Sequence, residues 1–325
     1  MFVRVLAALY LVVSVAGISI GPINIGFPGP GPAVKNIILT NDDGWATAMM
    51  RAQMDALIAE GYNVVMSAPS ENQSGTSSKS APPTVLNITC EFGTCDVGSP
   101  AVGTNASNTR INYVNSFPVN AVQYGLSTLA PKFFNGKPDF VVSGPNVGTN
   151  LLGDVMNSGT IGAACEAAKQ GIPAVAFSGS NLSQIAYTTL LSDPTSIDSR
   201  ASFLNSKLTT TFLHTLFASP ARPILPANIT LNVNFSPITQ CTSAFDYKFV
   251  LTRVEPIGQG GAVAGQDVQT CGTTTLPDES TVSHSGGCFV TVSVIDAVNK
   301  VDVDAKTQAF VLNRIGQLLS CFTGA

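Results

Sequence analysis

The sequence predicts an α/β fold in which a doubly wound, mostly parallel sheet carries helices on both faces. Short apolar runs alternate with helix-like segments between residues 36 and 235. The first unit, residues 36–70, has the order strand, helix, strand, which implies two parallel strands joined by a right-handed crossover. Repetition of this order along the chain is typical of open, Rossmann-like sheets.

Each element follows from its own local pattern. Helical periodicity is clearest in the first helix, where Gly61 is placed to end an apolar stripe made of Met50, Met54, Leu57 and Ile58. The polar segment 71–115 predicts loops and short antiparallel strands. Apolar runs predict strands at 36–41, 62–70, 138–144, 172–179 and 229–235, and helices are expected at 45–61, 118–130, 160–171 and 199–218.

The pattern changes after Pro237. Residues 248–255 and 288–296 are strand-like and are separated by a loop rich in Gly, Thr and Ser, so we expect a C-terminal β-hairpin extension used for packing or oligomerisation. An amphipathic, closing helix is expected at 306–321. We therefore assign residues 35–325 to a single α/β domain, of which 237–325 form the extension and the C-terminal helix.

The N-terminus has the features of a signal peptide. Arg4 precedes an apolar core at residues 5–15, which is too short to span a bilayer comfortably, and residues 14–16 are small enough for cleavage after Ala16. A Gly/Pro-rich linker at 17–34 follows the predicted signal peptide at 1–16. We expect a secreted, extracellular protein with no membrane association after cleavage; the alternative is an uncleaved membrane anchor.

Cysteines and glycosylation sequons fit a secretory route. Cys90 and Cys95 flank a short turn and are placed to pair locally, whereas Cys165, inside a predicted buried helix, is expected to be free. Pairing is left open among Cys241, Cys271, Cys288 and Cys321. Sequons begin at Asn72, Asn87, Asn105, Asn181, Asn228 and Asn234, which indicates a glycoprotein.

Composition excludes one class of partner. Charged residues make up only 11% of the 325-residue chain, the net charge is -4, and Lys and Arg form no basic stripe. Proteins that bind nucleic-acid polymers need clustered basic side chains to displace counterions. We therefore expect a small-molecule substrate and no nucleic-acid polymer.

Three polar clusters follow predicted strands. They are residues 41–44 after the first strand, 69–78 after the second, and 143–160 after later strands. In open α/β sheets, ligands bind beyond the carboxyl ends of the strands. We therefore expect the three clusters to share one edge of the sheet and to form the active site.

Asp42 and Asp43 need a counter-charge at this edge. Neither the first cluster nor the second contains Lys or Arg, so a hard divalent cation, Mg²⁺ or Mn²⁺, is the natural partner for the two carboxylates. Ser74 and Asn146 offer neutral oxygen ligands in the other two clusters. The alternatives are that the acidic pair caps the following helix and that Ser74 belongs to a plain flexible loop.

Residues 157–160 run directly into a predicted helix. Backbone amides at a helix N-terminus, together with the hydroxyls of Ser158 and Thr160, make a pocket for an anion; the alternative is a simple N-cap. A metal and an anion pocket on one rim predict phosphate-ester chemistry. There is no GxSxG elbow and no P-loop, and of the two histidines His284 is a weak candidate acid and His214 is expected to be structural.

The sequence resembles the SurE (stationary-phase survival protein) family of metal-dependent nucleotidases and acid phosphatases. The resemblance lies in "ILTNDDG", "SAPSENQSGTSS" and "PDFVVSGPNVGTNLLGDVMNSGTIGAACEAAKQGIPAVAFS", and it covers about residues 36–236. It implies one divalent metal held by Asp42, Asp43, Ser74 and Asn146, and hydrolysis of nucleoside 5′- or 3′-monophosphates or broader phosphomonoesters. It also implies a homodimer or tetramer built with the C-terminal hairpin, and the secretion features resemble fungal acid phosphatases.

In this scheme Asp42 and Asp43 are the catalytic carboxylates, and the substrate phosphate is held by Asn146, Ser158, Gly159 and Thr160. One departure from the family pattern is Asn120, which stands where the family motif GTPxDC has Asp. The alternatives are a secreted, non-catalytic binding protein on the same fold and another metal-dependent hydrolase, such as a phosphodiesterase.

Overall fold

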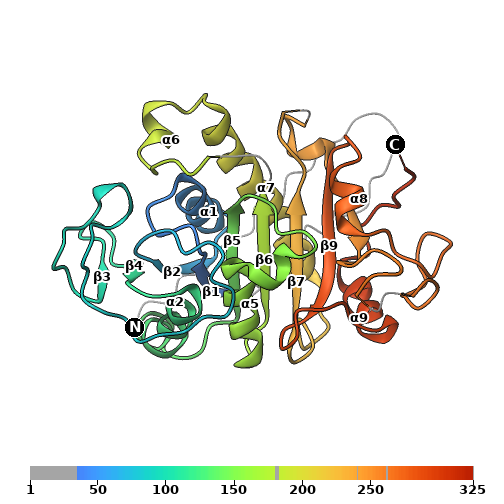
Figure 1. Cartoon of the computed structure of the whole chain (residues 1–325), viewed down its shortest axis with the longest axis horizontal. Helices are drawn as coiled ribbons and strands as arrows, with labels where there is room; N and C mark the ends of the chain where they lie inside the picture. The colour runs from blue at the N-terminus through green and yellow to red at the C-terminus, as the bar shows by residue number, and fades with distance from the viewer. Residues whose placement is uncertain (1–34, 180–182, 240, 261–262, 325) are drawn as a thin grey trace, which may run out of the picture. The chain divides into compact units, whose positions relative to one another are not determined.

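One nine-stranded sheet forms the centre of the part of the chain that the structure describes (Figure 1). The computed structural model describes residues 35–325 except 180–182, 240, 261–262 and 325. The predicted signal peptide, residues 1–16, and the linker, residues 17–34, lie outside the described residues. Within the described ranges, no helix combines the length and the apolar character that crossing a membrane requires.

The strand order confirms the predicted doubly wound α/β fold. From edge to edge the order is β3-β4-β2-β1-β5-β6-β7-β9-β8, and the six strands from β4 to β7 in that order run parallel. The edge strand β3 is antiparallel to β4, as expected for the polar segment. The strands are β1 (Asn36–Thr40), β2 (Asn63–Pro69), β3 (Val102–Thr104), β4 (Ile111–Val114), β5 (Phe140–Val147), β6 (Ala174–Gly179), β7 (Ile229–Phe235), β8 (Lys248–Thr252) and β9 (Phe289–Asp296).

The connections change direction at β1. The chain passes from β1 to β2 on one side and later returns to place β5 on the other side. In open α/β sheets such a switch point opens a crevice at the carboxyl ends of the strands. Thr40, the last residue of β1, pairs in register with Ser143 of β5, so the residues after β1 lie beside the last residues of β5.

Helices cover both faces of the sheet. One apolar cluster joins Leu39 to side chains of α1, α7 and α9, and a second cluster joins Ile38 to side chains of α2 and α5. Successive residues of a strand point to opposite faces, so the two clusters are the two cores of a three-layer fold. The α-helices are α1 (Ala48–Ala59), α2 (Pro118–Tyr124), α3 (Ala130–Phe134), α4 (Asp154–Asn157), α5 (Gly159–Lys169), α6 (Thr189–Ser192), α7 (Ile197–Ala218), α8 (Glu279–Ser283) and α9 (Ala305–Ile315), with single helical turns at η1 (Glu91–Gly93), η2 (Gly125–Leu129) and η3 (Ala244–Asp246).

The predicted apolar stripe of α1 is confirmed at three of its four positions. Met50, Met54 and Leu57 are buried, but Ile58 is 45% exposed, so its assignment to the stripe was wrong. Ile58 follows Leu57 directly, and one residue turns the side chain by about 100° around a helix. Gly61 ends the helix as predicted, with a φ of 84° and its N–H donating to the Ile58 carbonyl oxygen.

The C-terminal strands do not form the predicted β-hairpin. β8 and β9 are neighbours, but they pair in parallel, and β9 pairs antiparallel with β7. The two strands of a hairpin run antiparallel because a tight turn reverses the chain. Here a long crossover, which contains α8, carries the chain from β8 to β9, and both strands extend the main sheet.

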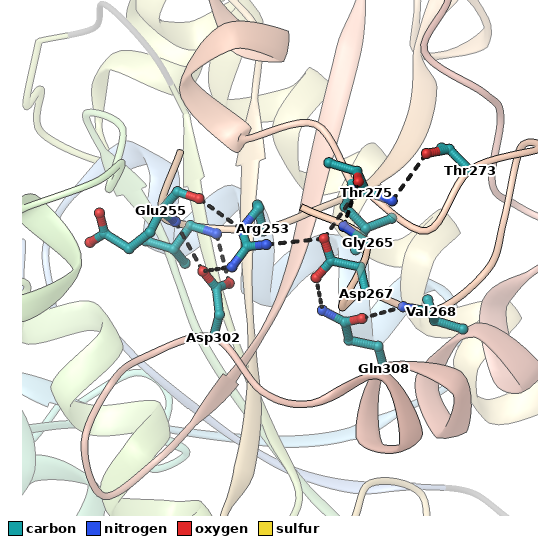
Figure 2. Close-up of polar contacts among 11 residues, drawn as sticks. Arg253, Glu255, Gly265, Asp267, Val268, Thr273, Thr275, Asp302 and Gln308 are labelled. Carbon is teal, nitrogen blue, oxygen red and sulfur yellow. Dashed lines mark hydrogen bonds and ion pairs between the residues drawn. The ribbon is translucent and has the colours of Figure 1, made fainter. Parts of the chain in front are cut away.

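A buried ion-pair network holds this crossover against α9 (Figure 2). Nη1 of Arg253 lies 3.0 Å from Oδ2 of Asp267, and its Nη2 lies 3.6 Å from Oδ2 of Asp302. Gln308 of α9 donates to the other oxygen of Asp267 at 2.9 Å and accepts from the N–H of Val268 at 2.7 Å. Loss of Arg253 would leave the carboxylates of Asp267 and Asp302 without their cation, which is strongly destabilising for buried charges.

The disulfides agree with the expected roles of the cysteines. Cys90 pairs with Cys95, as predicted. Cys165 is free and buried in α5, also as predicted. The pairing left open in the C-terminal region is Cys241 with Cys288 and Cys271 with Cys321.

Candidate active site

The structure brings two of the predicted clusters together at the switch point. Asp42 and Asp43 follow β1, and Asn146 lies near the end of β5. The backbone N–H of Val147 donates to Oδ2 of Asp43 at 2.8 Å, so the carboxyl ends of β1 and β5 are joined through the acidic pair. Both carboxyl groups are buried, with exposed fractions of 2% for Asp42 and 0% for Asp43.

The start of α5 packs directly against Asp42. The hydroxyl of Thr160 donates a short hydrogen bond to Oδ1 of Asp42. Ser158 is the N-cap of α5, and its hydroxyl oxygen accepts from the N–H of Ile161 at 3.1 Å, so the N-cap alternative holds for this residue. A Cβ atom on Gly159 would lie 2.8 Å from Cβ of Asp42, so only glycine allows this approach. The start of α5 therefore already holds one anion, the carboxylate of Asp42.

The second cluster reaches the site through its backbone. The N–H of Gln73 donates to the carbonyl oxygen of Asp42 at 2.7 Å. Ser74 follows, and it is exposed, with its N–H donating to Oδ1 of Asn72. Among the hydrogen bonds of the described residues, none joins the Ser74 hydroxyl to Asp42, Asp43 or Asn146. Ser74 therefore lies next in sequence to Gln73, whose backbone N–H contacts Asp42, but its own side chain makes no hydrogen bond with the acidic pair among the described residues.

Burial and mutual repulsion dominate the electrostatics of the pair. Burial raises the pKa of Asp42, while hydrogen bonds from Thr160 and Gly159 lower it. Burial and then the charge of Asp42 raise the pKa of Asp43 well above its ordinary value. The pair does not cap α1, whose N-cap is Thr47, so the helix-cap alternative is wrong.

The available donors fit a hard divalent cation. Asp42 and Asp43 are carboxylates with no Lys or Arg in ion-pair contact within the described part of the chain. Asn146 is 7% exposed, and its Nδ2 donates to the Gly148 carbonyl oxygen at 2.7 Å. Its Oδ1 is buried and has no hydrogen-bond partner among the described residues. Carboxylate and amide oxygens are the ligands that Mg²⁺ and Mn²⁺ prefer, and a cation there would relieve both the repulsion and the unpaired oxygen.

Gln184 is a site residue that the sequence did not reveal. Its Nε2 donates to Oδ1 of Asp43 at 2.5 Å, and its Oε1 accepts from Nδ2 of Asn72 at 3.1 Å. It therefore links the second cluster to the acidic pair. Gln184 lies 141 residues from Asp43 in a segment without a motif, so no local signal was present.

Glu91 is a second side chain that sequence reasoning missed. Its Oε2 is buried without a hydrogen-bond partner among the described residues, and it occupies the space that a Cβ on Gly44 would need. Burial, and then the charge of Glu71, raise the pKa of Glu91 to about 7. The Cys90–Cys95 disulfide closes the turn that carries it.

The remaining sequence candidates lie in supporting positions. Asn120 accepts from the N–H of Ala81 at 3.0 Å and donates to the Ser80 hydroxyl at 2.9 Å, so it ties the end of the polar loop to α2. His214 is exposed on α7 and lies 2.8 Å from Oε2 of Glu60. His284 caps α8, and its Nδ1 lies 2.8 Å from the Ser280 carbonyl oxygen.

Known proteins similar to this chain include enzymes of one family. The family model described as Survival protein SurE matches residues 37–255. The chain is 33% identical over 304 residues to an acid phosphatase of Yarrowia lipolytica, with 86% of this chain and 84% of that protein covered. It is 35% identical over 143 residues to a 5′-nucleotidase SurE of Lawsonia intracellularis, with 44% of this chain and 50% of that protein covered.

A solved structure shows the same fold. The SurE protein of Aquifex aeolicus superposes with a TM-score of 0.52, covers 80% of this chain and 93% of its own, and is 20% identical. The match to the bacterial nucleotidase spans about half of that relative's length. The family model covers more than half of this chain, and the Yarrowia relative is matched over most of its length. The chain belongs to the SurE family.

Proposed function

We propose that the chain is a phosphomonoesterase that depends on one divalent metal ion, Mg²⁺ or Mn²⁺, and that it acts on nucleoside 5′- or 3′-monophosphates or on broader phosphomonoesters. The observation that carries the proposal is the buried pair Asp42 and Asp43 at the end of β5, where Val147 donates to Asp43. Oδ1 of the preceding residue, Asn146, is buried and has no hydrogen-bond partner among the described residues. Family membership supports it, because relatives in the family are named acid phosphatase and 5′-nucleotidase SurE.

Asp42, Asp43 and Asn146 would hold the metal, with Ser74 as a further ligand from the neighbouring loop. A bound divalent ion supplies positive charge for the phosphate oxygens and lowers the pKa of a bound water. Support for Ser74 comes from the contact of Gln73 with the Asp42 backbone, which anchors the loop at the site.

The surrounding groups fix the orientation of both proposed catalytic carboxylates. Val147 and Gln184 each donate to a different oxygen of Asp43, and Thr160 donates to Asp42. Groups held in place before the substrate arrives need little reorganisation during reaction. In this scheme Asp42 and Asp43 hold the reacting groups, and one of them takes the proton of the attacking water.

The start of α5 is the proposed phosphate-binding element. Ser158, Gly159 and Thr160 stand at its N-terminus, where the helix dipole favours negative charge. Asn146 belongs to β5, which contacts the start of α5 through the hydrogen bond from the Ser143 hydroxyl to the Thr160 carbonyl oxygen at 2.7 Å. The close packing of Gly159 on Asp42 supports this arrangement, because it places the helix N-terminus against the acidic pair. Substrate phosphate would thereby meet backbone dipoles on one side and the metal ligands on the other.

The test is phosphate release from p-nitrophenyl phosphate, 5′-AMP and 3′-AMP, measured with Mn²⁺ and with EDTA. We expect turnover with Mn²⁺, none in EDTA, and a loss of at least about 1000-fold in Asp42→Asn and in Asp43→Asn. Asp246→Asn is the matched control, because Asp246 is exposed in η3 and should leave turnover unchanged.

Two outcomes would contradict the proposal. The absence of turnover of any phosphoester in Mn²⁺ would favour the secreted binding protein on the same fold. Faster hydrolysis of bis-p-nitrophenyl phosphate than of the monoester would favour a phosphodiesterase. Comparison of 5′-AMP with 3′-AMP and p-nitrophenyl phosphate then separates a nucleotidase from a broad acid phosphatase.

We also propose that the mature protein is a secreted glycoprotein and a homodimer or tetramer. The signal-peptide pattern and the disulfides support secretion. Asn234 is fully buried in β7, so the sequon at that position is closed to glycosylation in the folded protein. Mass spectrometry of protein from the culture medium and light scattering of the purified protein test these statements.

A further inference from the structure

Arg51 on α1 is buried, and no carboxylate of the described residues forms an ion pair with it. Its side chain is only 9% exposed, and its Nε donates to the Trp45 carbonyl oxygen at 2.8 Å. The guanidinium carbon lies 4.6 Å from the centre of the Tyr187 ring and 5.6 Å from the Trp45 ring. These contacts hold the guanidinium plane in place between two aromatic side chains.

The terminal nitrogens of Arg51 donate to no acceptor in the part of the chain that the structure describes. Among the described residues, the side chain of Arg51 donates one hydrogen bond, from Nε to the Trp45 carbonyl oxygen, and no carboxylate lies within ion-pair distance of it. Asp55, one turn along α1, is exposed and acts on Arg51 only as a weaker, more distant charge. The terminal nitrogens are not among the enclosed polar atoms of the described residues, so they face the adjoining cavity, where they can take an anion from solution.

A cavity of about 340 Å³ opens beside this guanidinium. Its lining includes Arg51, Trp45, Tyr187, Thr188 and Asn105. Hydroxyl and amide groups of that kind donate hydrogen bonds to oxygen acceptors. The volume accommodates a phosphate group with room for a substituent or for ordered water.

We propose that this cavity binds an oxyanion of the phosphate type, with the terminal nitrogens of Arg51 as the main ligand. The planar fork of a guanidinium matches two oxygens of a tetrahedral anion, which gives paired, charge-assisted hydrogen bonds. The site is distinct from the acidic pair, which repels a free anion, and it does not depend on the proposed phosphatase activity.

One short segment joins this cavity to the acidic pair. Gln184 contacts Asp43, and three residues later Tyr187 covers Arg51. Backbone hydrogen bonds from Ala48 to Ile185 (2.8 Å) and from Tyr187 to Ala46 (2.9 Å) fix this segment to the start of α1. An anion on Arg51 would therefore lie against the same segment that orients Asp43.

The only tryptophan of the chain reports on this cavity directly. Trp45 lines it, and the sequence contains a single Trp. We propose to titrate inorganic phosphate against chloride at constant ionic strength, in EDTA, and to follow Trp45 fluorescence. Protein made without N-glycosylation avoids a glycan on the Asn105 sequon. We expect a saturable change with one site per chain, weakened by at least about tenfold in Arg51→Met.

The matched control is Arg110→Met. Arg110 also lies over a ring, 5.1 Å from Phe133, and donates to a carbonyl oxygen, that of Val64 at 3.2 Å, but it does not line this cavity. This variant should bind phosphate like the wild type. The Asp42→Asn, Asp43→Asn double variant should do so too, because the cavity does not use the acidic pair.

Three results would overturn the proposal. They are no saturable binding in the wild type, unchanged binding in Arg51→Met, or loss of binding in the double Asp variant. If Arg51→Met unfolds, Arg51→Lys serves instead: it retains the charge but not the fork, so weaker binding supports the proposal and wild-type binding overturns it.

Discussion

Gly159 determines how closely the start of α5 approaches Asp42. A Cβ atom at this position would lie 2.8 Å from Cβ and 3.0 Å from Oδ2 of Asp42, and 3.0 Å from Cγ of Pro118. Because Asp42 is enclosed, it has no free direction in which to yield. The geometry of the acidic pair therefore depends on the absence of one methyl group.

Gly159→Ala should separate activity from stability. We expect kcat for p-nitrophenyl phosphate to fall by at least about tenfold, because a displacement of the order of 1 Å at a reacting group costs that much or more. The variant should remain folded at the assay temperature, because overpacking of this kind costs about 1–3 kcal/mol, and its thermal unfolding midpoint should be recorded beside kcat.

The control for this substitution lies in the same loop. Gly153 has a φ of -59°, and a Cβ atom there would meet nothing within 4 Å. Gly153→Ala should therefore keep the wild-type kcat. A wild-type kcat in Gly159→Ala would show that the contact with Asp42 is irrelevant to catalysis.

Among single residues, the sequence predicted those site residues whose position follows from the neighbouring strand. Asp42, Asp43 and Asn146 were found because each directly follows or ends a recognisable strand, and parallel strands bring such ends together. Gln184, Glu91 and Arg51 were not found as site residues. Their contacts arise from loops whose path depends on the whole fold, so no pattern in the neighbouring residues could report them.

At the scale of elements, a buried hydrogen-bond network around Glu279 joins α8, β7 and β9 to the loop of the third polar cluster, residues 143–160. Glu279 of α8 is fully buried and accepts from Asn232 of β7 at 3.0 Å and from Ser293 of β9 at 2.8 Å. Asn232 also donates to the Asn150 carbonyl oxygen at 2.8 Å. Glu279 thus fixes the loop that runs from Asn146 to α5.

Glu279→Gln should change the pH dependence of stability. Burial raises the pKa of Glu279 to about 8 from 4.5. Between these values the folded protein keeps a proton that the unfolded chain releases, so the wild type loses stability as pH rises from about 4.5 through about 8. The Gln variant does not pay this penalty, which amounts to at most about 5 kcal/mol at 1.4 kcal/mol per pKa unit.

The measurement is chemical unfolding of both proteins at pH 5, 7 and 9. The difference in unfolding free energy, variant minus wild type, should grow with pH. Glu60→Gln is the contrast, since hydrogen bonds from His214 and Lys207 lower the pKa of Glu60, and its loss should cost a little stability at neutral pH. A difference that stays constant or shrinks from pH 5 to pH 9 would show that Glu279 is not protonated in the folded protein.

Element types were predictable, but the pairing of the last two strands was not. Apolar runs and helical periodicity located β1, α1, β5 and α5 to within a few residues. The parallel pairing of β8 with β9 depends on a long crossover held by contacts such as Arg253 with Asp267. Strand-like sequence does not encode direction, so a hairpin and a crossover look alike until the connection is known.

At the scale of the whole molecule, the site lies where the sheet changes its winding direction. β1 and β5 flank the switch point, and their carboxyl ends carry the acidic pair and Asn146. The C-terminal strands join the same sheet on the far side of β7. Two disulfides close long loops in that C-terminal part.

Removal of a long-range disulfide should cost more stability than removal of the local one. Cys271 and Cys321 are 50 residues apart, whereas Cys90 and Cys95 are 5 apart. A cross-link limits the unfolded chain more when it closes a longer loop, so Cys271→Ser with Cys321→Ser should lower the free energy of unfolding by about 2–4 kcal/mol. Cys90→Ser with Cys95→Ser should lower it by less. Urea unfolding of the two double variants tests this order, and equal losses would contradict it.

Calorimetry on metal-free protein should compare the binding of Mn²⁺ to the wild type with its binding to Asp43→Asn, because these two affinities report whether the acidic pair holds the metal. We expect one Mn²⁺ per chain in the wild type and an affinity at least about 100-fold lower in the variant, because Asp43 is a charged ligand fixed by Val147 and Gln184. Equal Mn²⁺ affinity in the two proteins would show that the acidic pair does not hold the metal, because the cation would then bind somewhere other than the crevice between β1 and β5.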